Sequence, residues 1–172
     1  MKIKTKKMKK TILFGTLIIL GLASCTKEEV KPSETSTAVQ NYTNFKITSI
    51  QVNKIPMVNS NSESWDTFDG PDLRFNIENY NTDVLYKQTN YFENINYNNL
   101  PIKWDFSPQA YPITNFEVNY FISIYDFDYP DTDNKIGYVG FNFNQHKTGY
   151  PTSITKTSND GSISITINGN WY

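Results

Sequence analysis

Residues 116–126 read FEVNYFISIYD, the longest stretch of the chain in which apolar side chains recur at every second position. The alternating apolar positions are Phe116, Val118, Tyr120, Ile122 and Ile124. An alternation of period two places these side chains on one face of a β-strand, whereas a helix would need a spacing near 3.6. The stretch therefore predicts a strand with one buried face, which ends at Asp126.

Shorter runs of the same kind lie on both sides of this stretch, and Asn, Gly, Pro and Asp separate them. The further predicted strands cover residues 45–52, 73–78, 102–106, 137–143 and 163–167. No window has a sustained helical period with caps. This pattern is typical of an all-β fold, and we expect an eight-stranded antiparallel β-sandwich over residues 44–172. Residues 90–99 are rich in Asn and predict a long loop.

The first 24 residues have the pattern of a signal peptide. A Lys-rich start is followed by an apolar run of 13 residues, 11–23. A membrane-spanning helix needs about 20 apolar residues, so this run is too short for one. It ends in Leu22-Ala23-Ser24-Cys25, which resembles the lipobox of bacterial lipoproteins. The resemblance implies cleavage before Cys25 and a lipid on its thiol.

Cys25 is the only cysteine, and its alternative role is that of a free or buried thiol. With a lipid attached, it would anchor the chain in a membrane. Residues 25–43 then form the lipidated cysteine and a polar, flexible linker. Residues 27–29, Lys-Glu-Glu, resemble sorting signals for the outer membrane and its outer face, although an ordinary charged linker would have the same composition. We expect a lipid-anchored outer-membrane protein.

Removal of residues 1–24 makes the chain acidic. The chain has 16 basic and 17 acidic residues, and the leader contains six Lys and no acid, which leaves 10 against 17 and a net charge near −7. Nucleic-acid binding depends on clustered Lys and Arg, so this charge argues against nucleic-acid partners.

Two stretches concentrate the acidic residues. Residues 65–73 contain three Asp and residues 126–134 contain four, and neither stretch contains Lys or Arg. Carboxylates about 4 Å apart repel by roughly 4 kcal/mol at an effective dielectric constant of 20. Calcium, a hard cation that takes six to eight oxygens, would remove this repulsion. Zinc is excluded, because the chain has one His and one Cys.

The second stretch does not fit an EF-hand loop. Asp126 and Asp128 match its first and third positions, but Pro130 stands at the fifth, Asp131 at the glycine position and Gly137 at the final glutamate position.

Three segments resemble the C2 domain, an eight-stranded sandwich that binds calcium and phospholipid. Asp66 and Asp72, followed by Leu-Arg-Phe-Asn-Ile, resemble its first calcium loop. Residues 100–104 resemble the entry to a central strand, and residues 124–137, with Asp-Phe-Asp and a later Ile-Gly, resemble its third calcium loop.

The resemblance implies a set of calcium ligands: Asp66, Asp72, Asp126 and Asp128, with Asp131 or Asp133 as further candidates and Asn134 where the family has another Asp. The substitution by Asn removes one negative charge and puts a second ion in doubt. The alternative is a sandwich whose acidic loops are solvated and free of metal.

Aromatic residues are interleaved with these acids. Phe68, Tyr129 and Pro130 are the candidates for contact with a membrane or a partner, whereas Trp65 and Phe127 are expected to pack beneath the loops. No polybasic strand is present, which weakens the phospholipid interpretation.

We expect a binding or adhesion module rather than an enzyme, with an extracellular protein, glycan or lipid as its partner. A metal-free structural envelope lipoprotein is the second hypothesis. A hydrolase that uses the clustered carboxylates is the third and least favoured. The single histidine, His146, lies in a polar Gln-His-Lys stretch and is expected on the surface.

Overall fold

The computed structural model describes residues 41–67, 69–81, 83–106 and 108–172. The predicted signal peptide, Cys25, most of the linker and Phe68 lie outside the described residues. Within the described part, no helix is long and apolar enough to cross a membrane.

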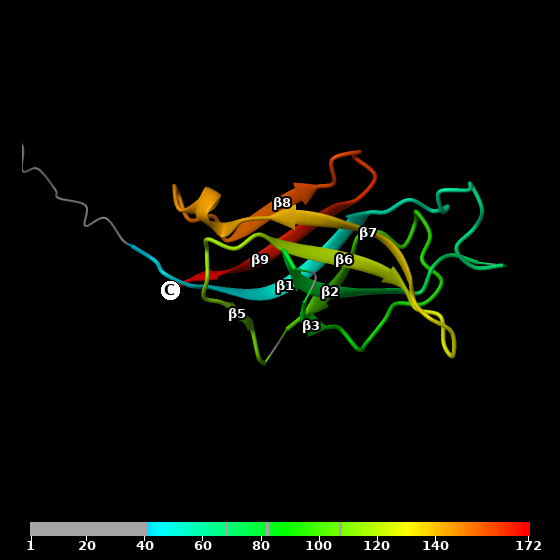
Figure 1. Ribbon diagram of the computed structural model, residues 1–172, viewed down its shortest axis with the longest axis horizontal. Helices are drawn as coiled ribbons and strands as arrows, with labels where there is room; N and C mark the ends of the chain where they lie inside the picture. Colours follow the sequence, from blue (N-terminus) through cyan, green and yellow to red (C-terminus); the bar gives the residue numbers. More distant parts are fainter. Residues whose placement is uncertain (1–40, 68, 82, 107) are drawn as a thin grey trace, which may run out of the picture. The chain divides into compact units, whose positions relative to one another are not determined.

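Antiparallel strands make up almost all of the regular structure in these residues (Figure 1). The strands are β1 (Phe45–Lys54), β2 (Leu73–Asn79), β3 (Val84–Lys87), β4 (Ile102–Asp105), β5 (Tyr111–Ile113), β6 (Tyr120–Asp126), β7 (Asn134–Phe141), β8 (Ser153–Thr157) and β9 (Ser164–Trp171). A short 3₁₀ helix, η1 (Phe143–His146), follows β7. The predicted all-β sandwich is confirmed.

The strands form two sheets. One has the order β4-β1-β9-β8, with β5 also paired to β1, and the other has the order β3-β2-β6-β7. β4 pairs with residues 49–52 of β1 and β5 pairs with residues 45–47, so these two strands share one edge of β1. The strands therefore occupy the eight positions of the predicted sandwich, with β4 and β5 together in one of them.

The core lies between the inner faces of the two sheets. In β6 the apolar residues Ile122 and Ile124 are fully buried, and they pair with Ile77 and Phe75 of β2, which are equally buried. These residues stand at every second position, as the predicted strand requires. Aromatic side chains fill the other end of the core, where the ring centres of Phe45 and Phe143 lie 4.6 Å apart.

The prediction of a strand at residues 116–119 is wrong. The Glu117 amide donates a hydrogen bond to the Asn115 side chain at 3.0 Å, which makes a turn of this segment, and β6 begins only at Tyr120. Phe116 still enters the core with 5% exposure. The expectation for His146 is also wrong, because it is half-buried and its Nε2 is buried without a hydrogen-bond partner.

The two ends of the described domain lie together. The amides of Thr43 and Asn44 donate to the Tyr172 carbonyl at 3.3 and 3.1 Å. β1 leads away from this end, and the loops 55–72 and 127–133 gather at the other end, on the right of Figure 1. We call this end, together with loop 88–99, the acidic pole.

Candidate metal site

Hydrogen bonds join the three loops of the acidic pole. The Phe127 amide donates to the Asp72 carbonyl at 2.8 Å, and the Ile95 amide donates to the Pro71 carbonyl at 3.0 Å. Gly70 makes the second contact possible, because a Cβ at this position would lie 1.8 Å from the Ile95 carbonyl oxygen. The backbone therefore holds the loops that carry the two acidic stretches side by side.

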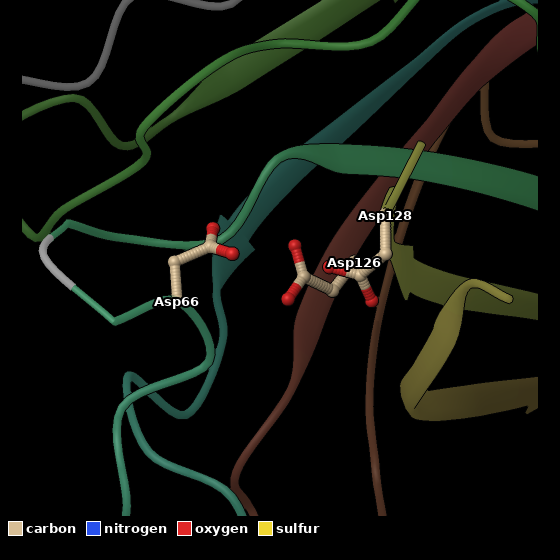
Figure 2. A group of neighbouring side chains, drawn as sticks. All are labelled: Asp66, Asp126 and Asp128. Atoms are coloured by element: carbon tan, nitrogen blue, oxygen red, sulfur yellow. The ribbon is translucent and has the colours of Figure 1, made fainter. Parts of the chain in front are cut away.

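Three carboxylates meet where the loops join. Asp126 is the last residue of β6, Asp128 lies two residues further on, and Asp66 comes from loop 55–72. One carboxylate oxygen from each lies within 4.8 Å of the others. Figure 2 shows the Asp66 side chain turned toward the other two. Like charges at this separation repel by about 3 kcal/mol per pair at an effective dielectric constant of 20.

Asp126 is the buried member of this trio, with 0% exposure. Its Oδ1 accepts a hydrogen bond from the Asp72 amide at 2.7 Å. Its Oδ2 is buried and has no hydrogen-bond partner. Burial raises the pKa of Asp126 to about 7, with further contributions from Asp66, Asp128 and Asp72, and the hydrogen bond from the Asp72 amide opposes this shift. The surroundings of this carboxylate therefore favour a bound proton or a bound cation over the bare charge.

The pKa of Asp66 is shifted in the same direction. Burial raises it, and the negative charges of Asp128, Asp72 and Asp69 add to the effect. The trio thus has the electrostatic character of a site that receives positive charge.

The other sequence-predicted ligands are not members of the trio. The Asp72 carboxylate accepts a hydrogen bond from the Asn94 amide at 2.8 Å and belongs to the loop framework. Asn134 donates from Nδ2 to Oδ2 of Asp128 at 2.7 Å. Asp133 forms an ion pair with Arg74. Asp131 is exposed.

Arg74 is a residue of this region that the sequence analysis did not single out. It lies on β2, where it pairs with Tyr125 of β6, and the residue before it pairs with Asp126. Arg74 is 9% exposed. Its guanidinium carbon lies 4.8 Å from the centre of the Phe127 ring. The sequence signal that could have identified Arg74 as part of this region is its position two residues after Asp72. The ion pair of Arg74 is with Asp133, and among the described residues no Lys or Arg pairs with a carboxylate of the trio.

The aromatic residues of the pole divide into packed and exposed ones. Trp65 is half-buried and donates from its indole nitrogen to the Pro56 carbonyl at 2.9 Å. Phe127 is half-buried, and its ring centre lies 4.5 Å from that of Tyr91. These two were expected to pack beneath the loops, and they do. Tyr129 is 85% exposed, and Pro130 beside it is also exposed.

No protein-family model and no curated protein matches the chain. Among solved structures it is similar to the pair of C2 domains of Extended-Synaptotagmin 2, with 15% identity and a TM-score of 0.48, over 90% of this chain and 48% of that one. The chain thus spans about half the length of that structure.

Two further structures are similar to a lower degree. A C2 domain of plant Extended Synaptotagmin 1 has 11% identity and a TM-score of 0.44, over 77% of this chain and 98% of that one. A C2 domain protein from Ramazzottius varieornatus has 15% identity and a TM-score of 0.42, over 76% of this chain and 89% of that one. Likenesses at this level say nothing about what this chain binds.

Proposed function

We propose that this chain is a non-catalytic, C2-like binding module whose acidic pole holds one calcium ion between Asp66, Asp126 and Asp128. The observation that carries the proposal is the buried, unpaired Oδ2 of Asp126 beside two further carboxylates. A buried charge is costly unless it is paired or coordinates a metal. A divalent cation would satisfy this oxygen and offset the repulsion within the trio.

Calcium fits this donor set better than magnesium does. It accepts six to eight oxygens in irregular geometry, and three carboxylates supply between three and six of them. Magnesium demands a near-ideal octahedron at shorter distances. Asp72 and Asp133 already have partners in Asn94 and Arg74, which favours one ion rather than two.

We propose in addition that Cys25 carries the lipid of an outer-membrane lipoprotein and that the module acts in binding or adhesion at the cell surface. The support for this part is the apolar run and the Leu-Ala-Ser-Cys motif at its end. Metabolic labelling with a palmitate analogue tests it. Label that survives the substitution Cys25→Ser would refute it.

The metal site is tested by thermal denaturation of the full chain carrying Cys25→Ser, in calcium and in chelator. A ligand present at 100 times its Kd stabilises the native state by about 2.7 kcal/mol. For affinities typical of extracellular modules, roughly 10⁻⁴–10⁻³ M, the shift should develop over millimolar calcium. The same concentration of magnesium should produce a much smaller shift.

Two variants make the test specific. Asp126→Asn combined with Asp128→Asn should abolish the calcium shift. Asp105→Asn is the matched control, because Asp105 is exposed on β4 and forms an ion pair with Lys103, and it should keep the whole shift. An unchanged melting temperature of the parent protein at millimolar calcium would instead favour the metal-free structural role.

A further inference from the structure

We propose that the ligand of the acidic pole is a neutral carbohydrate, whose vicinal hydroxyl groups complete the coordination of the ion at Asp66, Asp126 and Asp128 and whose ring stacks on Tyr129. This inference rests on the proposed calcium site and names the class of molecule that the site receives.

The coordination of the ion leaves room for outside oxygens. Two of the other predicted ligands are engaged elsewhere: Asp72 with the Asn94 amide and Asp133 with Arg74. Calcium with six to eight positions therefore keeps some for water or for a partner. Because Oδ2 of Asp126 is buried, protein would cover an ion bound there on that side, and any further oxygen would have to reach it from the side of the partly exposed Asp66 and Asp128.

The charge of the pole selects a neutral ligand. One dication on three carboxylates leaves a net charge of −1, and the exposed Asp69 and Asp131 lie on the same loops. The three loops of the acidic pole contain no Lys or Arg in the sequence. Arg74, just below them, is 9% exposed and paired with Asp133. A phosphate or a carboxylate would approach loops of net negative charge, whereas a hydroxyl oxygen carries no charge to be repelled.

Aromatic side chains supply the second half of such a site. Tyr129 follows Asp128 directly and is 85% exposed, and Tyr97 and Tyr91 of loop 88–99 are 71% and 39% exposed. Tyrosine combines an apolar ring face with a polar edge, which suits a molecule that has C–H faces and a hydroxyl rim. The Tyr91 ring packs on Phe127, which leaves Tyr129 and Tyr97 as the strongly exposed rings. Two such rings on one negatively charged pole match a sugar better than they match an anionic lipid surface.

A glycan array with neutral and sialylated glycans tests the inference on the full chain with Cys25→Ser. We expect retention on neutral glycans in millimolar calcium and its loss in chelator and in Asp126→Asn. Tyr129→Ser should weaken retention about tenfold, a loss of about 1.4 kcal/mol of binding free energy. Tyr80→Ser is the matched control, since Tyr80 is 73% exposed and directly follows the end of β2 that lies away from the pole, and it should bind as the parent does.

Vesicles of phosphatidylcholine with phosphatidylserine provide the competing arm. Calcium-dependent binding to these vesicles without binding to any neutral glycan would overturn the carbohydrate inference. A normal calcium shift in melting temperature without retention on the array would also overturn the carbohydrate inference. The proposed calcium site would not be affected by that result. Absence of the calcium shift would remove the metal site as well, so the two failures are distinguishable.

Discussion

Two buried carboxylates lie on the sheet β3-β2-β6-β7, and their surroundings are opposite. Glu78 of β2 is 4% exposed and accepts hydrogen bonds from Ser123 at 2.6 Å, Tyr125 at 2.8 Å and Lys135 at 3.3 Å. Asp126, at the end of β6, is 0% exposed and has one backbone donor and one unpaired oxygen.

The pKa values of these groups move in opposite directions. Burial raises the pKa of Glu78, but the donors Ser123, Tyr125 and Lys135 outweigh it and the net shift is downward. Burial raises the pKa of Asp126 to about 7, and the neighbouring carboxylates add to this shift. Burial alone therefore does not distinguish a structural carboxylate from a ligand-binding one. The partners differ: Glu78 accepts from three side-chain donors, whereas Asp126 keeps one buried oxygen without a hydrogen-bond partner and therefore favours a bound proton or a bound cation.

The largest expected effect belongs to Glu78. Glu78→Ala removes the acceptor for three donors and the carboxylate partner of Lys135, so we expect a loss of about 3 kcal/mol in unfolding free energy. Urea denaturation measures it. Glu78→Gln keeps the size and one acceptor oxygen and should lose less. A loss below about 1 kcal/mol for the alanine variant would show that the network contributes little.

Asp126→Asn should act in the opposite direction when calcium is absent. It removes the unfavourable buried charge and keeps an oxygen that can accept from the Asp72 amide, so unfolding free energy in chelator at pH 8 should rise by up to about 2 kcal/mol. The unfolding free energy of this variant should be the same in calcium as in chelator. A destabilised variant in chelator would mean that the Asp126 charge is already compensated within the protein.

The pH dependence of stability should differ at the two groups. Because the pKa of Asp126 is about 7 in the folded state and 3.8 as the reference, the metal-free protein gains stability as pH falls from about 7 toward 4. Glu78 has a lowered pKa, so its contribution is present above its reference value of 4.5 and is lost as pH falls below it.

Stability in chelator should therefore rise as pH falls from about 7 and be greatest between about pH 4 and pH 4.5. Denaturation curves between about pH 3 and pH 8 check this expectation. In saturating calcium the rise below pH 7 should disappear, because protons then compete with the ion. A flat profile in chelator would contradict the assignment of the raised pKa to Asp126.

The smallest effects are expected when the hydroxyl group of a tyrosine is removed, either beside Glu78 or in the acidic pole. Tyr125→Phe removes one donor to Glu78, whereas Tyr129→Phe changes only the edge of an exposed ring. The first should cost about 1 kcal/mol of unfolding free energy, and the second should stay within about 0.5 kcal/mol of the parent. Equal losses in thermal denaturation would show that the Tyr125 hydroxyl adds nothing to the network.

The alternation of apolar residues predicted the sandwich and most of its inner strands, because a buried strand face repeats every two residues. It missed β3, β5 and β8, which are short or largely exposed and carry no such pattern. It also extended β6 back to Phe116, since a core aromatic in a turn looks the same in sequence as one in a strand.

The proximity of Asp66 to Asp126 and Asp128 was an expectation from resemblance, and the geometry of the loops agrees with it. The pairing of Asp133 with Arg74 could not be predicted, because it depends on which face of β2 meets loop 127–133. The unpaired oxygen of Asp126 likewise follows from burial at a strand end, which no local pattern specifies.

The backbone hydrogen bonds from Thr43 and Asn44 to Tyr172 have a practical consequence for binding assays, because they place Tyr172 at the end of the domain opposite the acidic pole. A biotin, a dye or a chip linkage placed after Tyr172 leaves the loops with Asp66 and Tyr129 free to face the solution. Immobilisation through that residue therefore directs the candidate site away from the chip. A lack of binding in such an assay would then not be caused by the chip covering the site.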